Sequence, residues 1–278
     1  MDIFPHRRFA AKFASNVEDN EHILQVAIDM AMEAGRIQLR KFRSRHLEME
    51  TKTSIHDVVT EVDKECEAFL LSQINEAYPT HSVLGEETGM HHQESDWEWV
   101  IDPLDGTNNY SQGLPIFSVS IGVQYKGETQ VGVVYAPYLD ELFTASKGGG
   151  AAMNGRAIRV SRKTNFGECV LGTGFPYDKG TVTSYDNNLD NVCAILPKLR
   201  GLRRMGSAAY DLCCVASGIL DGYWEMGLKP WDMCAGALIV EEAGGKITHF
   251  RHDRGIALVA ANEALNREIF ALLGKDKE

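Results

Sequence analysis

The amino-acid sequence predicts an α+β fold of stacked helix and sheet layers. Apolar residues near the N-terminus recur at helical spacing, a central stretch alternates as an antiparallel meander does, and strands then alternate with helices. A length of 278 residues with 44% apolar content can bury one large core or two closely packed subdomains. We expect a single domain over residues 21–278, with subdomains of about 21–160 and 161–278, after an N-terminal arm of residues 1–20.

Two amphipathic helices are predicted to open the domain. Apolar residues fall at helical spacing over 23–37 and again over 62–74. The arm before them carries Arg7, Arg8 and Lys12 among phenylalanines. That composition fits either a frayed end or a targeting or partner segment.

A meander of antiparallel strands is predicted next. Residues 117–125 alternate strictly between apolar and polar side chains, which is typical of a half-buried strand. Short turns then lead into two further strands, at 129–137 and 141–146. The three glycines at 148–150 lack the G-K-S/T of a phosphate-binding loop, so they predict a turn.

Beyond about Ser161, strands alternate with helices and predict a second layered unit. The expected strands are 169–173, 202–205, 221–226, 246–250 and 256–261, and the expected helices are 185–196, 208–220, 231–243 and 263–273.

The charge balance excludes some classes of partner. With 28 Lys and Arg against 39 Asp and Glu, the formal net charge of −11 argues against general affinity for nucleic acid or an anionic membrane. An anionic substrate would need cations beside it, and a bound metal ion supplies them. Because no apolar run reaches transmembrane length and no secretory signal pattern is present, we expect a cytoplasmic protein. Its six cysteines form no C-x-x-C pair and predict reduced thiols.

Two aspartates follow a short apolar strand. Residues 99–101 deliver Asp102 to the carboxyl end of that strand, where open α/β sheets bind ligands, and a proline then turns Asp105 back toward Asp102. The amides of Gly106 and Thr107 would begin the next helix, and a helix start binds phosphate oxygens. An aspartate after a strand is also a common turn residue, so this pair alone leaves both interpretations open.

Further carboxylates occur elsewhere in the chain. Glu86 and Glu87 end another short strand, where they fit a metal site or a solvated loop, since adjacent carboxylates repel unless something compensates them. Asp232 precedes a long apolar helix and predicts an N-cap, a role that still leaves an oxygen for a metal. Because these candidate ligands are all oxygens, Mg²⁺ or Mn²⁺ fits better than zinc or copper.

Three motifs occur in a fixed order: G-E-E at 85–87, I-D-P-L-D-G-T at 101–107 and W-D-M-C-A-G-A-L-I-V-E-E-A-G-G at 231–245. In combination they resemble the signature regions of the inositol monophosphatase family. Segments 52–63, 113–122 and 204–209 extend the resemblance over residues 22–273. The resemblance implies a layered αβαβα sandwich of the inositol monophosphatase and fructose-1,6-bisphosphatase type, usually assembled as a homodimer.

The resemblance also implies a site with two or three magnesium ions, with Mn²⁺ as a possible substitute. Glu86, Asp102 and the Leu104 carbonyl would hold one ion. Asp102, Asp105 and Asp232 would hold a second, and Glu86 would share a weaker third. Such enzymes are lithium-sensitive, because lithium competes for a magnesium position.

Catalytic and substrate-binding roles follow from the same resemblance. Asp63, Thr107 and Glu86 would be catalytic, with Asp63 and Thr107 positioning a water molecule. The substrate would be bound by Gly106, Thr107, Asp105, Ala208, Glu225 and Asp232. Glu225 would contact substrate hydroxyls, although an exposed strand carboxylate explains it without any ligand.

The activity implied is magnesium-dependent hydrolysis of a small phosphate monoester, most directly inositol monophosphate to inositol and phosphate. Relatives with this core also act on fructose 1,6-bisphosphate, histidinol phosphate or 3′-phosphoadenosine 5′-phosphate. A substrate with extra phosphates would need further cations, for which Arg203, Arg204 and Lys229 are candidates. The non-enzymatic alternative is a regulatory binding protein that has lost catalysis; it predicts a missing metal carboxylate or a missing Thr107, and all are present.

Overall fold

The computed structural model describes residues 20–44, 47–51, 58–176, 187–251 and 255–273. Nearly all of the predicted N-terminal arm, residues 1–20, lies outside these ranges, as do the first residues of the helix predicted at 185–196. In the described part of the chain, no helix combines the length and apolarity needed to span a bilayer. All six cysteines fall within it and are free thiols.

The first sheet has eight strands in the order β10-β9-β8-β7-β6-β5-β3-β4. These are β3 (Ser82–Gly85), β4 (Gly89–His91), β5 (Trp97–Asp105), β6 (Ser118–Tyr125), β7 (Glu128–Ala136), β8 (Glu141–Ser146), β9 (Gly150–Met153) and β10 (Arg156–Ala157). Strands β5 to β9 pair antiparallel in sequence order, so the predicted meander is found. Strand β3 instead runs parallel to β5, so the carboxyl ends of these two strands lie at the same edge of the sheet.

Two helices, α1 (Asn20–Lys41) and α2 (Glu61–Ala77), cover the outer face of this sheet. Ile23 and Leu70 from the helices pack with Trp99, Ile121 and other buried strand side chains in one apolar core. A small hairpin of β1 (Met49–Thr51) and β2 (Val58–Thr60) precedes α2, and the short helix α3 (Thr107–Ser111) follows β5.

The second sheet has five strands in the order β12-β11-β13-β15-β14. They are β11 (Val170–Thr173), β12 (Gly201–Arg203), β13 (Gly222–Leu228), β14 (Lys246–Arg251) and β15 (Ile256–Ala261). Helices α5 (Ala208–Ala216) and α6 (Pro230–Glu242) lie between the two sheets, and α4 (Leu189–Ile195) and α7 (Glu263–Leu272) cover the far side of the second. The 3₁₀ turns η1 (Phe166–Glu168) and η3 (Leu196–Lys198) flank these elements.

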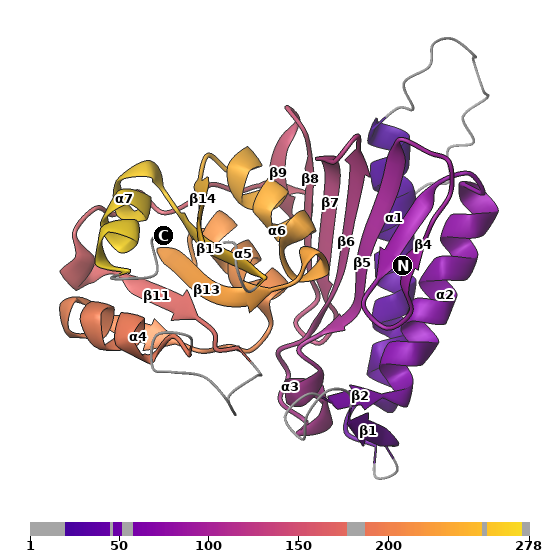
Figure 1. Ribbon diagram of the computed structural model, residues 1–278, viewed down its shortest axis with the longest axis horizontal. Helices are drawn as coiled ribbons and strands as arrows, with labels where there is room; N and C mark the ends of the chain where they lie inside the picture. The colour runs from indigo at the N-terminus through magenta and orange to yellow at the C-terminus, as the bar shows by residue number, and fades with distance from the viewer. Residues whose placement is uncertain (1–19, 45–46, 52–57, 177–186, 252–254, 274–278) are drawn as a thin grey trace.

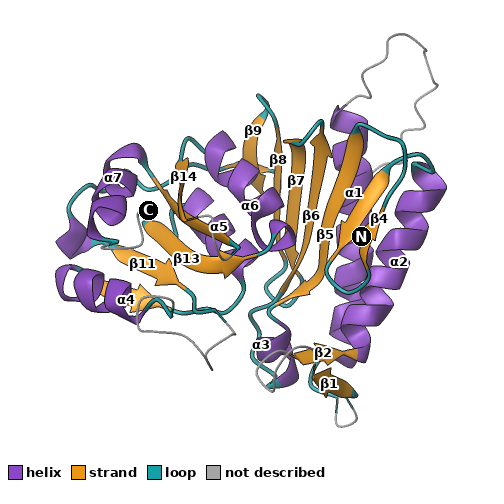
Figure 2. Cartoon of the chain, in the orientation of Figure 1, coloured by secondary structure: helices purple, strands orange, loops and turns teal. Residues whose placement is uncertain are grey.

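These elements stack in five layers, as Figure 1 shows from α1 and α2 at the right to α4 and α7 at the left. Figure 2 shows the two sheets separated by the helices of the middle layer. The predicted α+β class and the αβαβα sandwich are therefore confirmed.

Strand β6 differs from its prediction as a half-buried strand. Its apolar side chains face α1 and α2, but its polar face is buried as well, including Ser118 and Ser120. The reason is close packing of α6 on that face: a Cβ at Gly122 would overlap Cys234, and one at Gly132, its partner on β7, would lie 2.7 Å from the Ala235 carbonyl oxygen. Because the side chains on the polar face are small, helix α6 can pack against it, although alternation alone predicts that this face is exposed to solvent.

Helix α5 is shorter than the predicted 208–220. It ends at Ala216 because Gly218 adopts a left-handed conformation, with φ of 73°. A Cβ at Gly218 would also lie 3.3 Å from the Arg159 carbonyl oxygen, where the chain crosses from the first sheet to the second. The predicted helix end was therefore wrong by one turn.

Candidate active site

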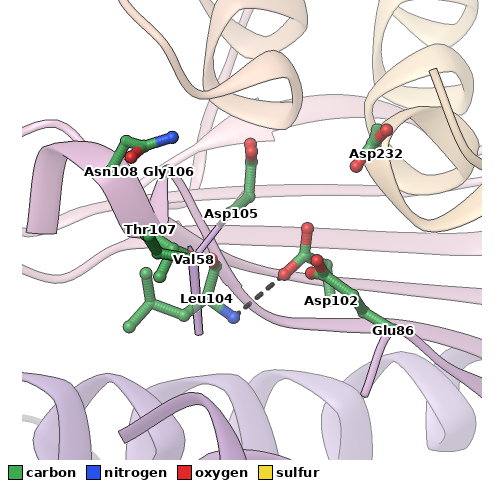
Figure 3. A pocket seen from close by; sticks show the side chains of 9 residues that line it. All are labelled: Val58, Glu86, Asp102, Leu104, Asp105, Gly106, Thr107, Asn108 and Asp232. Atoms are coloured by element: carbon green, nitrogen blue, oxygen red, sulfur yellow. Dashed lines mark hydrogen bonds between the residues drawn. The ribbon is translucent and has the colours of Figure 1, made fainter. Parts of the chain in front are cut away.

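A pocket of about 50 Å³ lies at the carboxyl ends of β3 and β5, where α3 and α6 begin. Figure 3 shows Asp105 and Asp232 extending into it from different elements, with Asp102 and Glu86 below them. The lining residues are Val58, Glu86, Asp102, Leu104, Asp105, Gly106, Thr107, Asn108 and Asp232. Every residue expected to bind metal is therefore in one pocket, although the segments that carry these residues are as much as 146 positions apart in sequence.

The segment 102–105 differs in detail from the expected strand followed by a turn. Strand β5 continues to Asp105, and its pairing with β6 shifts register between Asp102 and Asp105. A bulge of this kind re-aims side chains while the strand continues. The Leu104 amide donates to Asp102 Oδ1 at 2.9 Å, and this hydrogen bond restrains the Asp102 carboxylate against the backbone two residues further along.

Gly106 joins β5 to α3 in a left-handed conformation, with φ of 98°. A Cβ there would lie 3.0 Å from the Ile116 carbonyl oxygen and 3.3 Å from that of Gly206, so both conformation and space favour glycine. The predicted helix start is found at Thr107. Thr107 presents its hydroxyl beside the pocket, at 2.8 Å from Asp63 Oδ1 and 3.0 Å from the Leu104 carbonyl oxygen.

Asp63 is fully buried and does not line the pocket; it reaches the site through Thr107. It stands at the third position of α2, where its Oδ2 accepts from the Thr60 amide at 2.9 Å. One oxygen therefore caps a helix while the other accepts from the Thr107 hydroxyl. Apolar spacing predicts the helix, and the T-x-x-D pattern at 60–63 is the sequence signature that could have predicted this capping box.

Two residues of the middle layer without an individually predicted role, Ser207 and Ala209, hold Asp105. Its Oδ2 accepts from the Ser207 hydroxyl at 2.7 Å and from the Ala209 amide at 2.8 Å, at the start of α5. The Ala208 amide also helps to hold the Asp105 carboxylate in its charged form. The motif at 204–209 contains Ser207, so a signal was present, but only the fold brings it to Asp105.

Asp232 is not the N-cap that the sequence predicts. Lys229 is the N-cap of α6, Pro230 occupies the first turn, and Asp232 stands at the third helical position. Proline favours the first helical position because it has no amide hydrogen to satisfy, and it starts the helix earlier than expected. The Asp232 carboxylate still accepts from the Lys229 amide at 2.6 Å, while its side chain lines the pocket.

The pocket carboxylates raise one another's pKa values. Burial raises the pKa of Asp102 well above its ordinary range, and the neighbouring charges of Glu86, Asp105 and Asp232 raise it further. Burial also raises the pKa of Asp105, against the lowering effect of its hydrogen bond from Ser207. Although Asp232 keeps some exposure, its enclosure and the Asp105 charge raise its pKa well above the ordinary value. Such a cluster is electrostatically unfavourable until a cation enters it.

The donor chemistry fits a hard divalent ion. Carboxylates and the Leu104 carbonyl supply only oxygen, the donor that Mg²⁺ prefers, and no histidine or cysteine among the described residues lines the pocket. Within the described ranges, no three acidic, histidine or cysteine side chains already converge closely enough to hold a metal ion. The pocket residues therefore match magnesium in donor type and charge, but they do not form a preorganised coordination site.

Glu225 and Ala208 lie beyond the pocket wall. Glu225 is partly exposed on β13, accepts a hydrogen bond from the Tyr223 hydroxyl, and packs so tightly on Gly174 that a Cβ there would overlap it. Burial raises the pKa of Glu225 to about 7, against the lowering effects of Tyr223 and Arg204. A carboxyl group that titrates near neutrality therefore stands apart from the four pocket carboxylates.

Comparisons with known proteins agree with this fold. The family model described as "Inositol monophosphatase family" matches residues 19–275. "Nus factor SuhB" from Pasteurella multocida is 43% identical over 256 residues, which cover 89% of this chain and 94% of that protein.

Two solved structures are similar throughout. Extragenic suppressor protein suhB from Bartonella henselae matches with a TM-score of 0.85 and 35% identity, covering 91% of this chain and 99% of that one. Inositol monophosphatase from Anabaena (Nostoc) sp. matches with a TM-score of 0.80 and 38% identity, covering 91% and 95%. The chain therefore belongs to the inositol monophosphatase family.

Proposed function

We propose that this protein is a magnesium-dependent phosphatase that hydrolyses a small phosphorylated polyol, with inositol monophosphate as the first candidate. The observation that carries the proposal is the pocket itself, where four carboxylates and the Leu104 carbonyl stand beside the start of α3. Family membership supports phosphatase activity in general. We further propose a cytoplasmic homodimer, as the family resemblance implies.

Glu86, Asp102, Asp105, Asp232 and the Leu104 carbonyl would hold the magnesium ions. When bound, magnesium offsets the charge of the phosphate and makes water a stronger nucleophile near neutral pH. The contribution of the protein is to hold these oxygens in place. The Leu104 amide restrains Asp102, and Ser207 and the Ala209 amide restrain Asp105.

The amides of Gly106 and Thr107 are proposed to receive phosphate oxygens, because a helix start offers amide hydrogens without partners inside the helix. Thr107 and Asp63 would orient the attacking water. The hydroxyl of Thr107 donates to Asp63 at 2.8 Å, so its oxygen lone pairs remain able to accept from water. Asp63 cannot rotate away, since its other oxygen caps α2.

Glu225 is the proposed contact for substrate hydroxyls, and Ala208 is a further proposed substrate-binding residue. A carboxylate accepts hydrogen bonds from vicinal hydroxyls, and this discriminates a polyol from an aryl phosphate. Fructose 1,6-bisphosphate, histidinol phosphate and 3′-phosphoadenosine 5′-phosphate stay as alternative substrates. Arg204 is exposed near Glu225 and would favour a more anionic substrate.

The test is phosphate release from inositol 1-phosphate and from these three alternative substrates, with magnesium or with chelator. We expect turnover only with magnesium, fastest for inositol 1-phosphate, and inhibition by lithium. Full activity in chelator would contradict the metal mechanism. A preference for another panel member would keep the mechanism and reassign the substrate.

A regulatory role is the second candidate, supported by 43% identity to a protein named "Nus factor SuhB". Complementation separates the two functions. If a strain lacking this protein is restored by the Asp105→Asn variant as well as by wild type, the required role is independent of phosphatase chemistry. If only wild type restores it, catalysis is required.

A further inference from the structure

Glu67 is a buried carboxylate on α2 whose hydrogen-bond donors, among the described residues, come from one loop. Its side chain is only 1% exposed and does not line the pocket. Oε2 accepts from the Glu87 amide at 2.8 Å, and Oε1 accepts from the Thr88 amide at 2.7 Å and the Thr88 hydroxyl at 2.6 Å. Three donors thus converge on this carboxylate, and all belong to the two residues that follow Glu86.

The residue before Glu86 is packed against the same carboxylate. A Cβ at Gly85 would lie 2.8 Å from the Glu67 carboxyl carbon, so the backbone passes directly over the charged group. Gly85 is also paired with Gly89 across the β3-β4 hairpin, which leaves only 86–88 to make the turn. Glu86 therefore stands between a glycine that packs on Glu67 and an amide that donates to it.

The contacts continue from Thr88 to β4. Because the single hydroxyl hydrogen of Thr88 is directed to Glu67, its oxygen accepts from His91 Nε2, which lies 2.6 Å away. This chain of hydrogen bonds links α2, the turn and β4. It restrains the turn on both sides of Glu86.

We propose that Glu67 is the positioning residue for Glu86: by binding the amides of the 86–88 turn it aims the Glu86 carboxylate at Asp102. The inference rests on the proposed function, since it assigns Glu86 to the metal. Glu67 itself touches neither substrate nor metal. A charged acceptor suits this task, because hydrogen bonds to an ionised carboxylate are stronger than those to a neutral group.

The decisive variants change the acceptor or one donor. Glu67→Gln puts an NH₂ group where an amide hydrogen now points, and Thr88→Val removes one donor at nearly constant volume. Thr88→Ser keeps that donor and is the conservative rescue. Glu65→Gln is the control, since Glu65 lies on the same helix and pairs with Arg40 and Lys41 at the surface.

Magnesium binding to metal-free protein is measured by calorimetry, together with the magnesium half-saturation of p-nitrophenyl phosphate hydrolysis. Losing an outer partner of a metal ligand weakens binding by about 10- to 100-fold, which we expect for Glu67→Gln, with a smaller loss for Thr88→Val. Thr88→Ser and Glu65→Gln should match wild type. At saturating magnesium, kcat of Glu67→Gln should largely recover.

The possible outcomes are distinguishable. Failure of wild type to bind magnesium would overturn the proposed function itself. If wild type binds and Glu67→Gln melts lower but binds equally well, Glu67 is only a structural residue and this proposal is wrong. If Glu67→Gln does not fold, Thr88→Val decides: magnesium affinity equal to that of Thr88→Ser overturns the proposal, and a selective loss supports it.

Discussion

Ser207 donates its hydroxyl hydrogen to Asp105 across 2.7 Å, and this bond joins residues 102 positions apart in the sequence. Ser207 immediately precedes α5 in the middle layer, and Asp105 ends β5 in the first sheet. The same oxygen of Asp105 also accepts from the Ala209 amide. The start of one helix therefore holds a pocket carboxylate that belongs to another layer.

Ser207→Ala should weaken catalysis and lower stability together. A hydrogen bond to a charged group contributes about 1.5–3 kcal/mol, so we expect kcat/KM to fall about 10-fold or more. Loss of the donor also removes an effect that lowers the pKa of Asp105. Ser217→Ala is the control, since Ser217 bonds only carbonyls of its own helix. Unchanged kcat/KM in Ser207→Ala would show that the Ala209 amide is sufficient.

Asp102→Asn should stabilise the metal-free protein at neutral pH. Burial raises the pKa of Asp102 above its ordinary value of 3.8. The folded state then binds more protons than the unfolded state, so wild type loses stability as the pH rises from the ordinary value through the raised one. The amide has no such loss, and it can still accept from the Leu104 amide.

Thermal melts in chelator from about pH 4 to 8 test this expectation. The gain in melting temperature for Asp102→Asn should grow as the pH rises, and added magnesium should stabilise wild type more than the variant. Asp96→Asn is the control, because Asp96 is exposed beside Lys126. A variant that melts below wild type at every pH would contradict the repulsion among the pocket carboxylates.

Asp232→Asn should keep the fold and lose turnover. An asparagine oxygen can still accept from the Lys229 amide, so the first turn of α6 is preserved. One negative charge is lost from the pocket, and interactions with a catalytic metal are worth several kcal/mol, so kcat should fall about 100-fold or more. Circular dichroism melts and phosphate release are compared with Asp232→Ala, which should lose turnover and also melt lower, because it has no oxygen to accept from the Lys229 amide. Near wild-type kcat in Asp232→Asn would leave Asp232 a structural residue only.

Glu225→Gln should change substrate preference more than chemistry. If Glu225 accepts from polyol hydroxyls, kcat/KM for inositol 1-phosphate should fall about 10- to 100-fold relative to p-nitrophenyl phosphate. An equal fall for both substrates would assign Glu225 to the architecture of the site. No fall for either would exclude it from substrate binding.

The pH dependence gives an independent test of Glu225. Burial raises its pKa to about 7, so the ionised, accepting form grows as the pH rises through neutrality. The preference of wild type for inositol 1-phosphate over p-nitrophenyl phosphate should rise across the same range and be flat in Glu225→Gln. Tyr223→Phe removes a hydrogen bond that lowers this pKa, and it should move the midpoint upward. If Tyr223→Phe leaves the midpoint of this pH dependence unchanged, the titration of Glu225 does not cause the change in substrate preference.

Local pattern predicted most elements of the fold. Apolar spacing located α1 and α2, and strict alternation located β6, because these periodicities follow from helix and strand geometry. The local pattern could not show that β6 is buried on both faces, since the packing of α6 on Gly122 and Gly132 brings together segments that are distant in sequence. The end of α5 at Ala216 was missed for a similar reason: the crossing chain near Gly218 lies nearly 60 residues away in sequence.

Motif spacing and residue chemistry are properties of the chain, so they were enough to predict the family, the order of the layers and the carboxylates of the pocket. The groups that hold those carboxylates in place could be identified only in the folded protein. Ser207 reaches Asp105, and Glu67 reaches the turn after Glu86, through contacts that depend on how layers and neighbouring elements pack. Hydrogen bonds act over about 3 Å in space, and separation along the chain says nothing about that distance until the core has formed.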